Sequence, residues 1–257
     1  MDIQFDCTLC GQCCHNLKLT LTVAEAMRWL EDGNQVQVLT EAIPWPDEPA
    51  ADDLPALYKG ERSFPVLSGA LPSRVVVLLA AAFDGPCPNL LPDMRCGIYE
   101  RRPGICRTYP AESNPFIPIV PSNKRCPPEA WAPGGSSFAD AGNLVDAELR
   151  DTIAKTNSEA VDSVGTRQRL CAILGLDAAA LINEGFVVYS LEPALLLEAL
   201  QLAEQGTETA AAAASWVYVS NRSQTIDVLA SAGAHGLVAQ EVEGLPFEYV
   251  GYHSPSA

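Results

Sequence analysis

The sequence has few basic residues and no long hydrophobic run, and each absence excludes a class of protein. Lysine and arginine together number 16, against 32 aspartates and glutamates, which gives a net charge of −16. Nucleic-acid-binding proteins need a basic surface, and anionic membranes attract basic segments, so we expect neither nucleic acid nor membrane as a partner. The longest charge-free apolar runs, Val75–Phe83 and Ala210–Val219, are far shorter than the roughly 20 residues of a membrane-spanning helix.

The first residues also lack the features of a signal peptide. Met1–Cys7 has no basic start and no apolar stretch, so we expect no signal peptide and a cytoplasmic protein. Thiols stay mostly reduced in the cytoplasm. Dense cysteines in that compartment indicate metal binding or catalysis more often than disulfides.

The composition changes near residue 135. Seventeen of the 20 prolines and eight of the nine cysteines precede Gly135, and residues 132–137 have the composition of a linker. Residues 1–135 carry 16 acids and 11 bases, whereas residues 136–257 carry 16 acids and five bases. We therefore predict a cysteine-cluster metal-binding domain over 1–135 and a mostly helical, alanine-rich domain over 136–257.

Local patterns predict a mainly α fold with a loop-rich, cysteine-rich N-terminal half and little β. In the first half, Thr22–Glu25 fits a capping box at the start of a helix that ends near Gly33. Residues 40–74 have the composition of a long loop, and Arg74–Phe83 that of a buried strand. In the second half, Phe247–Tyr252 is typical of a short strand, and helical patterns cover residues 140–157, 164–174, 177–184, 193–205 and 209–232.

Four cysteines open the chain in the pattern Cys7-x-x-Cys10-x-x-Cys13-Cys14. Two-residue spacing lets successive thiolates surround one metal while backbone N–H groups point at the sulfurs, as in zinc knuckles and iron–sulfur loops. The side chains of the adjacent Cys13 and Cys14 point in different directions and do not easily share one metal ion. A ligand must therefore come from elsewhere, or the pair must serve two centres.

Four further cysteines can complete this site or form a second one. The eight candidate metal ligands are Cys7, Cys10, Cys13, Cys14, Cys87, Cys96, Cys106 and Cys126. Two of them precede a proline, as does the last cysteine of the bacterial ferredoxin run, which favours an iron–sulfur cluster over zinc. His15 could replace a thiolate, although a hydrogen bond to a sulfur or a backbone group is the simpler interpretation.

Arginine is concentrated beside these cysteines. Arg95, Arg101, Arg102 and Arg107 lie within 13 residues. Guanidinium groups can offset the charge of a thiolate-bound metal or bind a carboxylate or phosphate in bidentate geometry. A solvated loop with salt bridges to nearby acids explains them equally well. We predict Arg101, Arg102 and Arg107 as cofactor-binding residues, and for Arg107 a contact with the metal ligands.

Two blocks of sequence resemble the YkgJ-like cysteine-cluster family, also called the CxxCxxCC family. The first block is residues 5–14 (FDCTLCGQCC); the second is residues 87–90 (CPNL) followed by residues 96–107 (CGIYERRPGICR). The resemblance covers roughly residues 5–130 and implies a zinc- or iron-chelating domain. A related cysteine run occurs in flagellin lysine N-methylases, which implies an iron–sulfur cluster and S-adenosylmethionine. The second half of the chain does not resemble the methylase, and no G-x-G-x-x-G loop is present.

Three functions are compatible with these residues. We favour a metal-binding protein that holds an iron–sulfur cluster or zinc through clustered cysteine thiolates. The first alternative is a metal-dependent, protein-modifying transferase that uses S-adenosylmethionine. The second is a structural zinc module that serves protein interaction, since a loop-rich half needs a metal to fold. The partner is then an unidentified protein or a small-molecule substrate.

Overall fold

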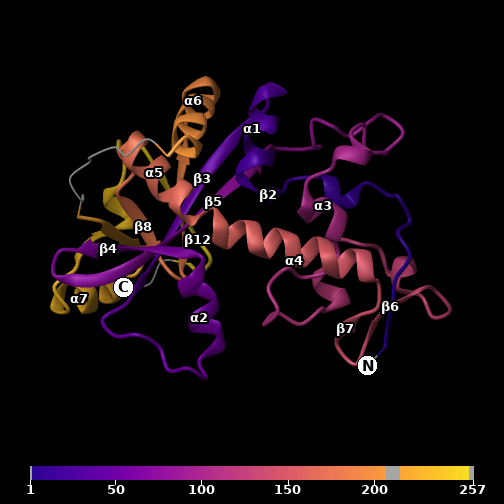
Figure 1. Cartoon of the computed structure of the whole chain (residues 1–257), viewed down its shortest axis with the longest axis horizontal. Helices are drawn as coiled ribbons and strands as arrows, with labels where there is room; N and C mark the ends of the chain where they lie inside the picture. Colours follow the sequence, from indigo (N-terminus) through magenta and orange to yellow (C-terminus); the bar gives the residue numbers. More distant parts are fainter. Residues whose placement is uncertain (1, 207–214, 255–257) are drawn as a thin grey trace.

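The structure, a computed structural model, describes residues 2–206 and 215–254. It is an α/β fold with 35% helix and 27% strand. The molecule is elongated: a large sheet and most of the helices occupy one end, and the cysteine-rich loops occupy the other (Figure 1). The N-terminal strand β1 (Ile3–Gln4) belongs to the cysteine-rich end, and the C-terminal strand β12 (Glu248–Gly251) belongs to the sheet.

Nine strands of the described residues pair in one mixed sheet. Its main path runs β11-β10-β8-β3-β5-β2, while β4 pairs with β5, and β9 pairs with both β3 and β12. Strands β3, β8, β10 and β11 run parallel, and the other pairings are antiparallel. The remaining bounds are β2 (Lys18–Leu21), β3 (Val36–Pro44), β4 (Ser63–Ser68), β5 (Leu71–Ala82), β8 (Ala178–Leu181), β9 (Gly185–Ser190), β10 (Val217–Ser220) and β11 (His235–Val238).

The prediction of a mainly α fold with little β is therefore wrong. The helix expected over 177–184 is instead β8, an alanine strand buried between β3 and β10, where position in the sheet overrides the helical preference of alanine. The helix expected over 209–232 is strand β10 followed by helix α7 (Ser223–Ser231), and its first residues, 209–214, lie outside the described residues. β10 is rich in β-branched and aromatic residues, and this composition is the sequence signal for a strand at this position.

The long loop expected over residues 40–74 is also wrong. This segment holds most of β3, helix α2 (Leu54–Glu61), β4 and the start of β5. Residues 45–53, 62 and 69–70 connect these elements without regular structure. Pairing with β5 along its whole length gives β3 its extended form, and such non-local pairing leaves little trace in local composition.

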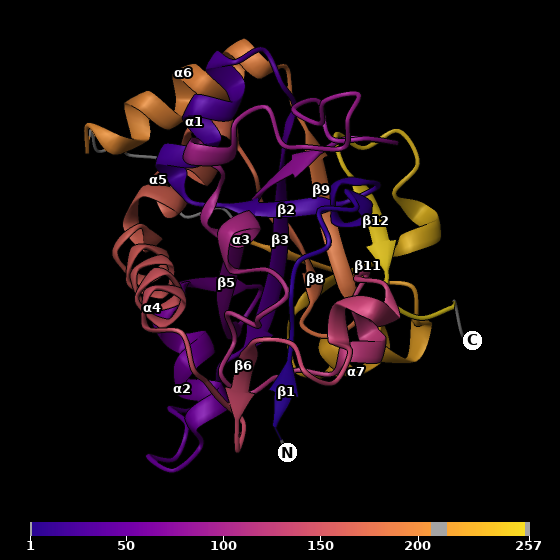
Figure 2. The ribbon, with the colours of Figure 1, turned by 90° about the vertical axis from the view of Figure 1, so that its right-hand side faces the viewer.

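Helices pack mainly against one side of the sheet. α1 (Val23–Glu31) contacts β2, β3 and β5, and α6 (Pro193–Glu204) contacts both α1 and α5 (Val164–Leu174). Figure 2 shows these three helices gathered beside the sheet. The predicted α1 is confirmed with its capping box, and α5 and α6 lie close to their expected bounds. The largest fully buried side chains of the core are Leu79, Leu170, Tyr189, Leu196, Leu200 and Tyr218.

The cysteine-rich end has little regular structure. A three-stranded sheet joins β1, β6 (Ser137–Asp140) and β7 (Asn143–Leu144), and one short helix, α3 (Gly104–Thr108), lies among the loops. Phe5, Trp131 and Phe138 pack together beside this sheet, with ring centroids 4.7 to 6.4 Å apart. Of these three rings, Phe5 also lines the cavity that contains most of the cysteines.

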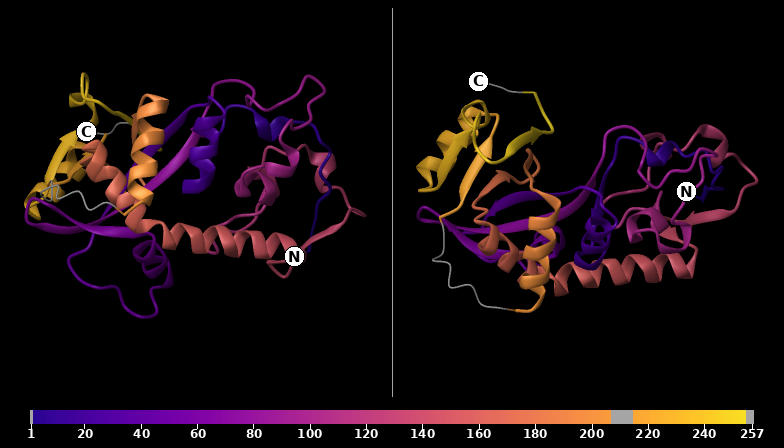
Figure 3. Two further views of the ribbon diagram at one scale, coloured as in Figure 1. Left: turned by 45° about the horizontal axis from the view of Figure 1, so that its top comes forward. Right: turned by 90° about the horizontal axis from the view of Figure 1, so that it is seen from above.

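Helix α4 (Ala147–Asp162) connects the two ends. It runs from the cysteine-rich loops to the sheet in both views of Figure 3 and contacts α3. The main sheet pairs β3 with β8 and β9, so it contains strands from both sides of residue 135. The domain boundary near residue 135 stays a prediction.

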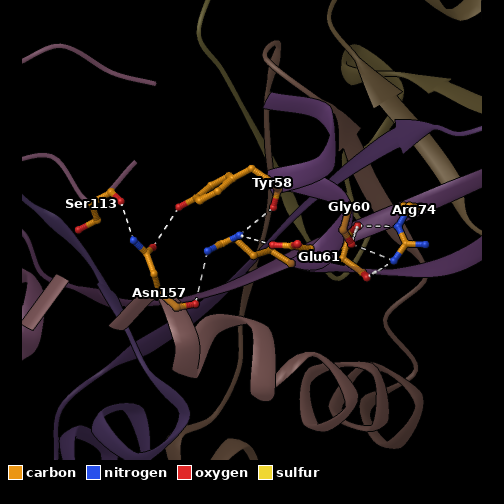
Figure 4. A network of polar contacts seen from close by, with 8 residues as sticks. Tyr58, Gly60, Glu61, Arg74, Ser113 and Asn157 are labelled. Carbon is orange, nitrogen blue, oxygen red and sulfur yellow. Dashed lines mark hydrogen bonds and ion pairs between the residues drawn. The ribbon is translucent and has the colours of Figure 1, made fainter. Parts of the chain in front are cut away.

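A polar network attaches α4 to α2 and to the loop after α3 (Figure 4). The Tyr58 hydroxyl donates to Asn157 Oδ1 at 3.0 Å, and Asn157 Nδ2 donates to the Ser113 carbonyl at 3.0 Å. The Arg62 guanidinium lies 3.4 Å from the centroid of the Tyr58 ring and donates to the Tyr58 carbonyl at 3.0 Å. These contacts join α2 and the loop after α3 to helix α4.

None of the helices in residues 2–206 and 215–254 is long and apolar enough to cross a membrane.

Candidate metal centre

The N-terminal cysteine run forms a tight curl. Residues Gln12–Cys14 form a 3-10 turn that is preceded by Gly11 at φ 68°, and the Cys14 N–H donates to the Gly11 carbonyl at 2.9 Å. A Cβ at Gly11 would lie 2.6 Å from Cε of Met94, so the Met94 side chain would have to shift, and the backbone at φ 68° would be strained for any residue with a side chain. Glycine therefore allows the curl to approach the loop that carries Met94.

That loop brings two distal cysteines to the curl. The Cys87 N–H donates to the Cys14 carbonyl at 2.7 Å, and Leu90 forms a β-bridge with Cys96. Further backbone bonds close the loop, from Leu91 to the Arg95 carbonyl at 2.8 Å and from Gly97 to the Asn89 carbonyl at 2.7 Å. Main-chain hydrogen bonds thus position Cys87 and Cys96 beside Cys14.

Helix α3 positions Cys106. The helix starts after Pro103, whose missing N–H is no loss at a helix start. The N–H of its first residue, Gly104, donates to Glu25 Oε1 at 2.7 Å. The other oxygen of Glu25 accepts from the Thr22 N–H in the capping box of α1. One carboxylate therefore joins the start of α1 to the helix that carries Cys106.

Cys126 is held by its neighbour Arg125 and by Tyr109. Arg125 donates from Nη1 to the His15 carbonyl at 3.0 Å, and its backbone N–H donates to the Tyr109 hydroxyl at 2.7 Å. The same hydroxyl hydrogen-bonds to the Cys126 thiol. His15 itself contacts the Gly11 carbonyl through Nδ1 at 3.0 Å and does not line the cysteine cavity.

The cysteines surround a cavity of about 610 Å³. Cys87 is outside its wall and packs, as Cys106 does, against the hydrophobic core of the sheet. All nine cysteines are free thiols, and Cys171 is buried in α5 away from the others. The seven cysteines in the cavity wall are Cys7, Cys10, Cys13, Cys14, Cys96, Cys106 and Cys126.

The thiols influence one another's ionisation. A hydrogen bond from the Cys14 thiol lowers the pKa of Cys13 to about 6, and that same bond is the main reason why the pKa of Cys14 is raised. Burial raises the pKa of Cys106 to about 12 and that of Cys126 to about 11, and repulsion from neighbouring thiolates adds to both shifts. Cys14, Cys106 and Cys126 therefore resist ionisation until a cation balances the charge.

No three His, Cys, Asp or Glu side chains in the described ranges are already arranged to hold a single metal ion. A mononuclear zinc site needs four donors at roughly 2.0–2.3 Å from one point. The thiols are instead spread around the cavity wall. The donor set, seven cysteine thiols in one cavity wall, fits a metal group of thiolate-binding type.

The predicted arginines separate into two kinds. Arg102 and Arg107 line the cavity, and the Arg102 guanidinium contributes to lowering the pKa of Cys13. Arg101 does not line it; its Nη1 pairs with Asp32 at 3.0 Å, at the end of α1. Arg95 also lines the cavity but is engaged twice by Asp93 Oδ2, at 2.6 and 2.8 Å.

Two contacts of this site cannot be predicted from the sequence. Glu25 is recognisable as part of a capping box, but its bond to Gly104 joins positions 79 residues apart. Met94 has a φ of 66°, a conformation that side-chain-bearing residues rarely adopt, and its fit against Gly11 depends on how two loops meet. Tertiary packing alone creates both contacts.

The chain was compared with known proteins. Residues 6–127 match the model of the CxxCxxCC family, which is described as a putative zinc- or iron-chelating domain. No curated protein and no solved structure matches the chain. The matched segment contains every cysteine from Cys7 to Cys126. It therefore includes all seven cysteines of the cavity wall and Cys87.

Proposed function

We propose that this chain, whose residues 6–127 belong to the CxxCxxCC family, holds iron–sulfur clusters through eight cysteine thiolates. The observation that carries the proposal is the convergence of four separate chain segments on one thiol-lined cavity. The segments are the N-terminal curl, the loop after Cys87, helix α3 and the Arg125–Cys126 turn. Thiolates select zinc and iron–sulfur clusters among biological metals.

The number of thiols favours clusters over one zinc ion. One zinc ion takes four donors, whereas seven cysteines line one cavity of about 610 Å³ and Cys87 is joined to that wall by its backbone bond to Cys14. The cysteines are partly buried rather than exposed, except for Cys7. A site of this kind excludes much of the solvent, which protects a cluster.

The eight thiols divide into two sets of four in this proposal. The first set holds Cys14 with Cys87, Cys96 and Cys106, because backbone bonds tie Cys14 to Cys87, and Cys87 and Cys106 share the edge of the hydrophobic core. Among the neighbouring thiolates, Cys87 contributes most to raising the pKa of Cys106. The second set holds Cys7, Cys10, Cys13 and Cys126, whose thiols are electrostatic neighbours. Cys13 and Cys14 then serve different centres, which is one of the two arrangements that their adjacency in sequence allows.

Anaerobic purification followed by analysis for iron, zinc and acid-labile sulfide tests the proposal. We expect iron and sulfide in comparable amounts, with a broad absorption band near roughly 400 nm. Zinc without colour would contradict the cluster and support the structural zinc module. We assign the protein to the cytoplasm, where free thiols persist. The S-adenosylmethionine-dependent transferase stays a prediction from the resemblance.

Single variants test the division into two sets. Cys10→Ser and Cys96→Ser should each remove about half of the iron, because each takes a ligand from a different centre. Cys171→Ser is the matched control, since its thiol is buried in the core and far from the cavity. Loss of all iron from both ligand variants would indicate one shared centre, and unchanged iron in either would remove that cysteine from the ligand set.

A further inference from the structure

The thiol cavity adjoins a second cavity. The second has a volume of about 520 Å³ and lies between α3 and the start of α4. Arg102 and Arg107 belong to the walls of both cavities, so the two guanidiniums stand where the cavities meet. The six residues common to both walls are Phe5, Cys7, Tyr99, Arg102, Arg107 and Tyr109.

Arg102 is fixed in place but not saturated. Its Nε donates to the Tyr99 carbonyl at 3.0 Å, and its guanidinium carbon lies 3.7 Å from the centroid of the Tyr99 ring. Its two terminal nitrogens donate to no acceptor among the residues that the structure describes. Stacking on an aromatic ring orients a planar guanidinium and leaves its outer edge available for a bidentate acceptor.

Arg107 is held only weakly. Among the described residues its one ionic partner is Glu148, 3.3 Å from Nη2, and the Glu148 side chain is 83% exposed. Ion pairs between exposed side chains contribute little to stability and exchange readily with solvent or with another anion. Arg107 can therefore turn to a ligand in the cavity without a large loss elsewhere.

We infer that Arg102 and Arg107 bind the oxyanion of a small molecule, a carboxylate or a phosphate, beside the metal. The inference rests on the proposed function, because the site adjoins the proposed clusters. The wall of the thiol cavity also contains apolar and aromatic side chains, which suit a ligand with an apolar or aromatic body. These wall residues are Leu9, Leu91, Met94 and Tyr99.

Charge compensation for the thiolates is the competing role for these arginines. Arg95 separates the two roles, because it lies in the same cavity wall and carries the same charge. Its Nε and Nη2 both donate to Asp93 Oδ2, at 2.8 and 2.6 Å, and its backbone N–H donates to Asp93 Oδ1 at 3.1 Å. Two bonds and a local turn therefore occupy this edge of the guanidinium, whereas Arg107 has the single contact to Glu148. Removing the Arg95 charge changes the field in the cavity but removes no free donor pair. Arg95→Gln is therefore the matched control.

Isothermal titration of the anaerobically purified, metal-loaded chain tests the inference. The probes are 4-phenylbutyrate, the phosphonate with the same phenylalkyl chain, and the neutral amide 4-phenylbutyramide. We expect at least one acid to bind about tenfold more tightly than the amide, since charge-assisted bonds to guanidinium need the anion. The stronger of the two acids identifies the natural headgroup as a carboxylate or a phosphate.

Variants complete the test. Arg102→Gln and Arg107→Gln should each weaken binding of the acid about tenfold, while Arg95→Gln leaves it unchanged. Iron content, measured on the same samples, should be equal in all three. Absence of acid binding, equal binding of acid and amide, or equal loss in Arg95→Gln would overturn the inference. Iron lost only from Arg102→Gln and Arg107→Gln would assign them to the metal instead. Absence of metal from the wild-type chain would refute the proposed function separately.

Discussion

Glu25 joins two helices through its two carboxylate oxygens, and this predicts how strongly the cysteine-rich end is anchored. Oε2 accepts from the Thr22 N–H at 3.0 Å within the capping box of α1, and Oε1 accepts from the Gly104 N–H at 2.7 Å. Gly104 is buried, so its N–H depends on the Glu25 carboxylate as its acceptor. The prediction compares the substitutions Glu25→Ala and Thr22→Ala.

The two substitutions should differ by the value of the bond to Gly104. Thr22→Ala removes the side-chain cap of α1, which costs about 1 kcal/mol. Glu25→Ala removes the reciprocal bond of the capping box. It also leaves the buried Gly104 N–H without its charged acceptor, and this second loss costs about 1–3 kcal/mol. We therefore expect Glu25→Ala to lower the free energy of unfolding by about 3 kcal/mol.

Urea denaturation of both variants measures these losses. A second assay follows metal release to a chelator, because α3 carries Cys106 and loses its anchor only in Glu25→Ala. Glu25→Ala should release metal faster than Thr22→Ala. Equal stability losses and equal release rates in the two variants would refute the reasoning, since the bond to Gly104 would then contribute nothing.

Two further predictions concern Glu41 and Gly11. Burial raises the pKa of Glu41 from 4.5 to about 7, against the opposing effects of the Asn183 backbone and of Lys59. The folded chain therefore binds this proton more tightly than the unfolded chain does. The free energy of unfolding then falls as the pH rises from about 4.5 to about 7. Glu41→Gln removes this loss, so it should be more stable than wild type by about 3 kcal/mol at pH 8 and equally stable at pH 4. Denaturation curves at both pH values measure this, and the same difference in free energy of unfolding at pH 4 and pH 8 would contradict the assignment. Gly11→Ala places a methyl group 2.6 Å from Met94 Cε at a positive φ, so it should cost more than the 1–2 kcal/mol or so of backbone strain alone and should speed metal release. Gly33→Ala, at φ +82° with open space around it, is the control, and equal losses in the two thermal denaturation experiments would show that Met94 yields without cost.

Local chemistry was sufficient for part of the fold. Thr22 and Glu25 specify the start of α1 because both partners of the capping box lie within one helical turn. Strand β8 could not be predicted in the same way, since Ala178–Leu181 is a strand only because β3 and β10 pair with it on either side. The same non-local pairing extends β3 through a segment whose composition is typical of a loop.

The sequence by itself identifies the candidate metal-binding cysteines, because thiolate chemistry and two-residue spacing can be recognised within a short stretch of chain. Their arrangement was decided by tertiary structure. Arg101 and Arg102 are neighbours in the chain, yet one pairs with Asp32 and the other stacks on Tyr99 in the cavity wall. The direction of a side chain depends on the surfaces that meet around it, and sequence spacing carries no record of contacts formed between segments far apart in the chain.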